Sequence, residues 1–76
     1  MHLQDALRRW ITGMCEGKSE DAQVETLLNV LKVLLDHPEA RQLRSLANYR
    51  HRLHTPGYGV DDLTNTIIAA TEDLTR

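Results

Sequence analysis

Aromatic side chains, cysteine and long apolar runs are all scarce in this chain of 76 residues. Trp, Tyr and Phe make up only 4% of it, with one Trp, two Tyr and no Phe. Hydrophobic residues still reach 41%, so a core must be built largely from Leu, Val and Ile. That fraction, with 26% charged residues, indicates a globular protein and excludes a disordered one. A chain of this length holds one domain.

The single cysteine, Cys15, excludes an internal disulfide, the usual stabiliser of small secreted domains. No apolar run approaches the length of a transmembrane helix, so no contact with a membrane is expected. Residues 1–5 lead directly into an amphipathic pattern, without the basic and apolar regions of a signal peptide. We therefore expect a cytoplasmic protein. Because so small a core barely offsets the entropy of folding, we also expect a partner or a second copy.

Helical periodicity of the apolar residues predicts an all-α fold. We expect a small four-helix bundle or a pair of helical hairpins, completed by dimerisation, in a single domain over residues 1–76. The four predicted helices cover residues 3–16, 19–36, 38–54 and 60–75.

Local signals mark the ends of these helices. Ser19 is a natural N-cap for the second helix. Asp36 and Glu39 form a capping-box pattern around Pro38, so the second helix should end near Asp36 and the third should follow directly. The turn formers of residues 55–59 predict a loop before the fourth helix.

The second helix carries more aliphatic residues than one buried stripe needs. Eight of the twelve residues from 24 to 35 are aliphatic, and such a helix must be covered on more than one side. A large exposed apolar patch usually marks a contact. We therefore predict a homodimer built through this helix together with the first or the fourth. Its predicted interface residues are Leu27, Val30, Leu31 and Leu34.

Positive charge gathers in residues 37–54, although the whole chain has a net charge of −2. Four arginines there stand against one acidic residue. Such a segment gives charge complementarity to an acidic protein surface. The predicted partner-binding residues are Arg41, Arg44, Arg50, Arg52, Tyr58 and Trp10.

Trp10 and Tyr58 each allow two interpretations. Trp10 falls on the apolar stripe of the first helix, so it belongs either to the core or to an interface, where large aromatics are enriched. Tyr58 lies in the loop over residues 55–59, either as a lid over the end of the bundle or as an exposed contact. The sequence leaves both questions open.

Nucleic-acid binding is the alternative use of the basic segment. A basic helix after a tight corner is also the arrangement of a helix-turn-helix protein, in which arginines contact phosphate. The chain would then be a small dimeric transcriptional regulator. Two observations oppose this: the chain is acidic as a whole, and Asp36 and Glu39 would repel phosphate at the groove-facing end.

Residues with catalytic or metal-binding chemistry are few. His51 and His54 share a helix face and could hold zinc with further ligands, but no compact set of four donors is present. The candidates for the further ligands are His37, His2 and Cys15. Cys15 itself lies on an apolar stripe, where a thiol is poorly ionised. We therefore predict no metal, no cofactor and no enzymatic activity.

The sequence thus favours a small cytoplasmic protein-interaction module, such as an adaptor, a chaperone-like factor or an inhibitor of a larger protein. It would bury aliphatic surface against its partner, and the arginines would orient the contact.

Overall fold

The computed structural model describes residues 3–75, which form four α-helices and one short 3-10 helix, without a strand. The all-α class is therefore confirmed, while dimerisation stays a prediction. Within this range, no helix is both long enough and apolar enough to cross a bilayer. The elements in chain order are α1 (Leu3–Cys15), α2 (Glu20–Asp36), η1 (Pro38–Gln42), α3 (Leu46–His54) and α4 (Val60–Leu74).

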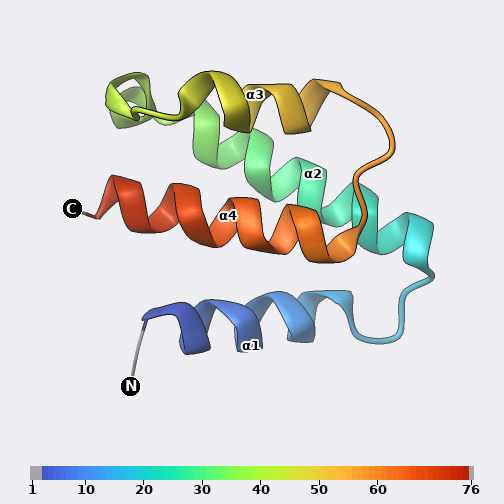
Figure 1. Cartoon of the computed structure of the whole chain (residues 1–76). Helices are drawn as coiled ribbons and strands as arrows, with labels where there is room; N and C mark the ends of the chain where they lie inside the picture. Colours follow the sequence, from blue (N-terminus) through green and yellow to red (C-terminus); the bar gives the residue numbers. More distant parts are fainter. Residues whose placement is uncertain (1–2, 76) are drawn as a thin grey trace.

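Helices α2 and α4 form the centre of the fold. Helix α4 lies between α1 and α3 (Figure 1), and α2, which crosses behind it, contacts every other element. The contact between α2 and α4 is the most extensive in the structure. The Cα atoms span 35 × 33 × 17 Å, so the molecule is flat. In so thin an arrangement, α1 and α3 form opposite edges and keep much of their surface in solvent.

Side chains cap two helix N-termini, that of α2 and that of η1, which follows α2. As predicted, Ser19 is the N-cap of α2, and its Oγ accepts a hydrogen bond from the backbone N–H of Ala22 at 3.3 Å. The predicted capping box of Asp36 and Glu39 is wrong. His37 caps η1 instead, with its Nδ1 accepting the N–H of Glu39 at 3.1 Å. An imidazole nitrogen therefore accepts the capping hydrogen bond that the sequence predicts for a carboxylate.

The predicted single helix over residues 38–54 is wrong, because η1 and α3 are separated by an extended turn at Leu43. Ala40 and Tyr49, on either side of the break, are both buried, at 0% and 8% exposed. In one continuous helix, nine residues at about 100° each would place them on opposite sides. The break lets each segment turn its own apolar side to the core. Ala47 is exposed.

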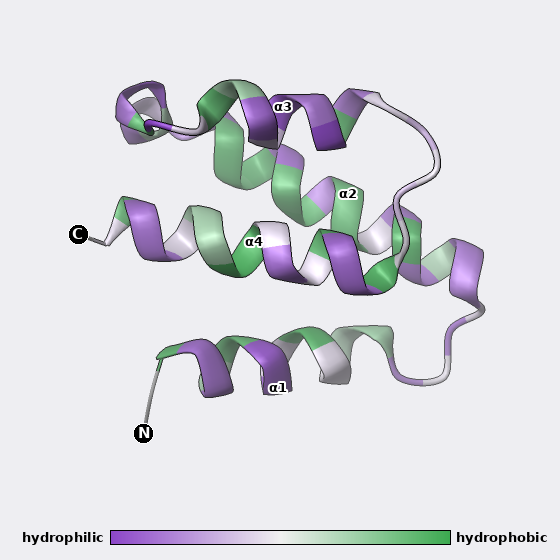
Figure 2. Cartoon of the chain, in the orientation of Figure 1, coloured by the Kyte–Doolittle hydropathy of each residue, from purple (hydrophilic) through white to green (hydrophobic). Residues whose placement is uncertain are grey.

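One hydrophobic core joins all four α-helices, and its largest fully buried side chains come from α2 and α4. Hydrophobic residues concentrate on these two helices, whereas α3 is largely hydrophilic (Figure 2). An apolar seam along α4 is buried or half-buried throughout, as is the flanking Ile68. The seam consists of Val60, Leu63, Ile67, Ala70 and Leu74.

Helix α2 is covered within the chain more fully than its sequence predicts. Leu27 and Leu31 are 0% exposed, so in this fold they offer no surface to a second copy, and their place in the predicted interface is corrected. Val30 and Leu34 are half-buried, and their part in an interface stays a prediction. Val33, which precedes Leu34 in sequence, is 73% exposed.

Candidate functional site

The six predicted partner-binding residues lie on two separate surfaces. Four of them, which we call the basic edge, belong to η1, α3 and the turn between these helices, and Tyr58 lies in the loop that follows α3. Trp10 lies on α1, at the other edge of the molecule, with α4 between (Figure 1). The basic edge consists of Arg41, Arg44, Arg50 and Arg52.

No ion pair with the described part of the chain neutralises the charges of the basic edge. Arg41, Arg44 and Arg50 are exposed, and Arg52 is half-buried. None of the four guanidinium groups makes an ion pair with any residue from 3 to 75. Their positive charge therefore remains available to an anionic group from outside the chain.

Arg52 is the member of the basic edge with a defined orientation. Its guanidinium carbon lies 5.0 Å from the centroid of the Tyr58 ring, in a cation–π contact. The Tyr58 ring in turn meets the His51 ring edge-on, with centroids 6.1 Å apart. Tyr58 is half-buried and packs against the core, which supports its interpretation as a lid over the end of the bundle. Through the cation–π contact, the Tyr58 ring also orients the Arg52 side chain.

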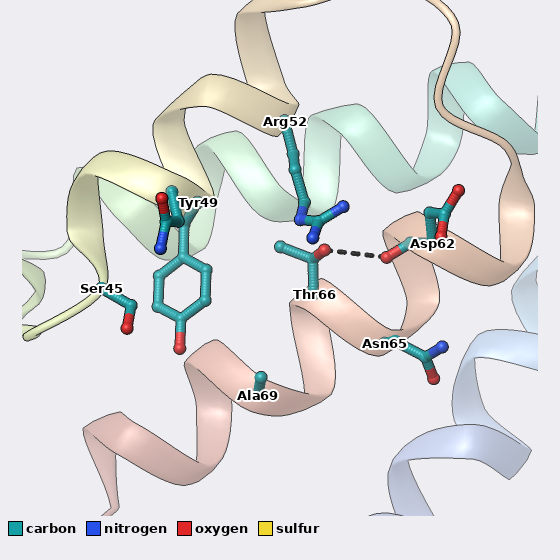
Figure 3. Close-up of a pocket in the computed structure, with 8 residues that line it drawn as sticks. Ser45, Tyr49, Arg52, Asp62, Asn65, Thr66 and Ala69 are labelled. Atoms are coloured by element: carbon teal, nitrogen blue, oxygen red, sulfur yellow. Dashed lines mark hydrogen bonds between the residues drawn. The ribbon is translucent and has the colours of Figure 1, made fainter.

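Arg52 faces a polar groove between α3 and α4 with a volume of about 370 Å³. It reaches across from α3 toward Thr66 and Asp62 on α4 (Figure 3). The Thr66 hydroxyl donates to the backbone oxygen of Asp62 at 2.8 Å, so it is already satisfied. The groove is lined by Ser45, Asn48, Tyr49, Arg52, Asp62, Asn65, Thr66 and Ala69.

Sequence reasoning missed this groove, since its asparagines look like ordinary solvent-facing residues until α3 and α4 are packed together. Chemically, a guanidinium group beside carboxamides can bind a carboxylate through charge-assisted hydrogen bonds. Asp62 on the opposite wall would repel a second negative charge. The groove therefore suits a mixed polar surface better than a uniformly anionic one.

Cys15 borders a second cavity, of about 500 Å³, between the C-terminal end of α1 and the N-terminal end of α4. The thiol residue is only 7% exposed, and no histidine lines the cavity to act as its base. Among the described residues, no group of three or more His, Cys, Asp and Glu side chains is placed to hold a metal ion. His2, one of the candidate zinc ligands, lies outside those residues.

Trp10 is not a core residue, because 53% of its surface is exposed. Its neighbours on the same side of α1 are also exposed: Leu3 at 45%, and Ala6. We call these three residues the α1 strip. It is open because α2 diverges from α1 after the turn that joins them (Figure 1). The two helices are tied near that turn, where Gln23 Nε2 donates to the Cys15 carbonyl at 3.2 Å.

No family model matches this chain, and no curated protein sequence or solved structure matches it either. Its function must therefore be argued from the basic edge and the α1 strip themselves.

Proposed function

We propose that the chain is a small protein-interaction module that acts by binding rather than by catalysis, and that its basic edge docks on an acidic surface of a larger protein. One observation carries this proposal. The four arginines of the edge have no ion pair within residues 3–75. Carboxylates of a partner would gain these contacts without breaking any internal one, and the local positive field would steer the encounter.

Arg52 is the most preorganised contact residue of the basic edge. Because the Tyr58 ring already orders its side chain, less conformational freedom is lost when a carboxylate binds. The neighbouring Asn48 of the groove offers both a donor and an acceptor to the partner's polar side chains. Asn65 offers mainly its amide donor, because its Oδ1 already accepts a hydrogen bond from Arg8 Nη2 at 3.0 Å. Asp62 favours a protein surface of mixed polarity over the uniform negative charge of a phosphate backbone.

Nucleic-acid binding by a dimeric transcriptional regulator is the second candidate, because the same free arginines could contact phosphates. Helix α3 would be its recognition helix. Two features oppose this role. Helix α3 has only nine residues, and the whole of η1 is inserted between it and α2, whereas a helix-turn-helix uses a turn of three to four residues.

Affinity capture from the native host tests the leading proposal. The wild-type chain should retain an acidic protein that a variant with both Arg44→Ala and Arg50→Ala loses. Lys32→Ala on α2 removes one positive charge outside the basic edge, as does Arg9→Ala on α1, so their combination is the matched control and should retain the partner. A wild-type and a double variant that capture the same proteins would contradict the proposal.

Titration with duplex DNA over a series of salt concentrations tests the second candidate. Binding that falls steeply with salt and is weakened by Arg44→Ala would favour the regulator. Absence of binding at low salt would eliminate it.

We also propose that the chain is a cytoplasmic homodimer. The free, buried thiol of Cys15 suits a reducing compartment. The exposed apolar residues Leu3 and Trp10 supply surface for self-association that the covered residues of α2 do not.

A further inference from the structure

The α3 side of the polar groove carries a row of side chains that make no hydrogen bond inside the described chain. Ser45, Asn48 and Arg52 follow one another at spacings of three and four residues, on one face of α3, and all line the groove. The Ser45 hydroxyl does not cap α3. Neither the Asn48 carboxamide nor the Arg52 guanidinium bonds to any residue from 3 to 75. These three groups are therefore open to a ligand in the groove.

The α4 side of the groove has fewer free groups. The Thr66 hydroxyl donates to the backbone oxygen of Asp62, and Oδ1 of Asn65 accepts from Arg8. The Asn65 amide N–H groups and the Asp62 carboxylate remain free. Because α3 and α4 run antiparallel (Figure 1), Arg52 and Asp62 lie at the same end of the groove (Figure 3).

We propose that this groove binds a short extended segment of the acidic partner. Arg52 holds one Asp or Glu side chain of the segment, and Asn48 and Asn65 hold its main chain. This contact rests on the proposed function, since the segment belongs to the same partner. It adds the form in which the partner presents its acidic residue: an extended peptide, not a helix.

The groove has the length of about three extended residues. Its lining runs from Ser45 to Arg52 on α3 and from Asp62 to Ala69 on α4, about 10 Å along each helix. An extended chain advances about 3.3 Å per residue, so three residues reach from one end to the other. An acidic side chain at the Arg52 end then leaves the rest of the segment beside the asparagines.

The carboxamides identify a peptide main chain as the occupant. A carboxamide offers a donor and an acceptor side by side, which matches the C=O and N–H groups of a peptide. In an α-helix those main-chain groups are bonded to one another, whereas in an extended segment they are free. Asn48 therefore pairs with both groups of the segment, and Asn65 donates to a second C=O. A helical partner would leave both asparagines without these contacts.

The two charged residues at one end of the groove limit the segment to one acidic side chain there. The Tyr58 ring, 5.0 Å from the guanidinium carbon, orients Arg52, and a guanidinium group pairs with a carboxylate through two parallel hydrogen bonds. Asp62 repels a second carboxylate and accepts a main-chain N–H instead. The expected recognition pattern is therefore a single Asp or Glu among neutral residues.

NMR titration of the isotope-labelled chain with synthetic peptides tests this contact. One peptide is capped at both ends and carries a single Glu among Ser and Thr residues, and a second has Gln in place of the Glu. The Glu peptide should shift the side-chain amide signals of Asn48 and Asn65 and should bind about tenfold more tightly than the Gln peptide. Asn29, the third asparagine of the chain, is exposed on α2 and should not shift.

Substitutions with matched controls test each wall contact. Asn48→Ala should weaken binding of the Glu peptide about fivefold, because it removes hydrogen bonds to the peptide main chain. Asn29→Ala should have no effect. Arg52→Gln should abolish the preference for Glu over Gln, whereas Lys32→Gln, which removes a positive charge from an exposed site of α2, should preserve it. Far-UV circular dichroism checks that every variant keeps its helices.

The outcomes separate this contact from the proposed function. A Glu peptide that shifts only signals near Arg44 and Arg50 supports the basic edge and overturns the groove contact. Binding that Asn48→Ala leaves unchanged, or tighter binding of an alanine-rich helical peptide with one Glu, overturns the extended segment. The groove contact also fails if millimolar Glu peptide shifts neither asparagine signal. Failure of the proposed function appears separately, in the affinity capture with the variant of Arg44 and Arg50.

Discussion

Tyr49 on α3 donates its phenolic hydrogen to Oδ2 of Asp73, near the C-terminal end of α4, across a distance of 2.5 Å. The tyrosine is 8% exposed, and its ring belongs to the hydrophobic core. Helix α3 has nine residues, too few to be stable without tertiary contacts. The hydrogen bond to Asp73 and the burial of the Tyr49 ring therefore hold α3 against the core. Helix α3 carries Arg50 and Arg52, so these contacts also position both arginines.

Tyr49→Phe should lower the free energy of unfolding by about 1.5 kcal/mol, because it removes a hydrogen bond to a charged group and keeps the ring. Urea denaturation followed by circular dichroism measures the change. Tyr58→Phe is the matched control, since the Tyr58 hydroxyl makes no hydrogen bond to the described part of the chain. Equal, small effects of the two substitutions would show that the bond to Asp73 contributes little.

Two glycines of the first helix region should respond in opposite directions to alanine. Gly13 lies inside α1, and a Cβ there would meet no atom within 4 Å. Gly13→Ala should therefore raise the free energy of unfolding, by up to about 1 kcal/mol. Gly17 has a φ of +79°, which an L-residue adopts only with strain, so Gly17→Ala should lower it by about 1 kcal/mol. Thermal melts of both variants check the direction of each change in stability. A change in the same direction for both variants would contradict this assignment of the turn.

The first residues of α2 and α4 could be predicted from the sequence because the signals that mark them are local. Ser19 fixes the start of α2 and the loop over residues 55–59 fixes the start of α4, and both depend on a few neighbouring residues. The break between η1 and α3 is different. It accompanies the burial of Tyr49 in the core, where the tyrosine hydroxyl bonds to Asp73 of α4, 24 residues away. A local pattern carries no such information.

The candidate surfaces were predictable only in part, since exposure depends on how many neighbours each helix finds. The arginines of the basic edge could be identified from charge alone. The aliphatic excess of α2 suggested an open face, yet α4, α3 and α1 all pack on it and bury Leu27 and Leu31. The uncovered face belongs instead to α1, because α2 diverges from it and leaves Trp10 in solvent.

Arg52 and Tyr58 should be energetically coupled. Their cation–π contact, at 5.0 Å, is partly shielded from water and should contribute about 0.5–1 kcal/mol. A double-mutant cycle of Arg52→Ala and Tyr58→Ala, measured by urea denaturation, isolates this term from the packing that each residue loses alone. The same cycle with Arg50→Ala, an exposed arginine of the same helix, should give no coupling. Additive effects of Arg52 and Tyr58 would mean that the ring does not hold the guanidinium group.

The neighbouring residues Trp10 and Ile11 should differ sharply in their effect on the folding of the single chain. Ile11 is 3% exposed and belongs to the core, so Ile11→Ala should lower the free energy of unfolding by about 3 kcal/mol. Trp10→Ala removes a larger side chain, yet should cost less than about 1 kcal/mol in dilute solution, where the chain is monomeric, because half of the indole is already in water. Urea denaturation followed by circular dichroism compares them, since the tryptophan signal is lost in one variant. Should Trp10→Ala be as costly as Ile11→Ala at low concentration, the indole is part of the monomer core and the α1 strip offers no free surface to a second copy. A Trp10 contribution that grows with protein concentration, beside an Ile11 contribution of constant size, is the result expected of an interface residue next to a core residue.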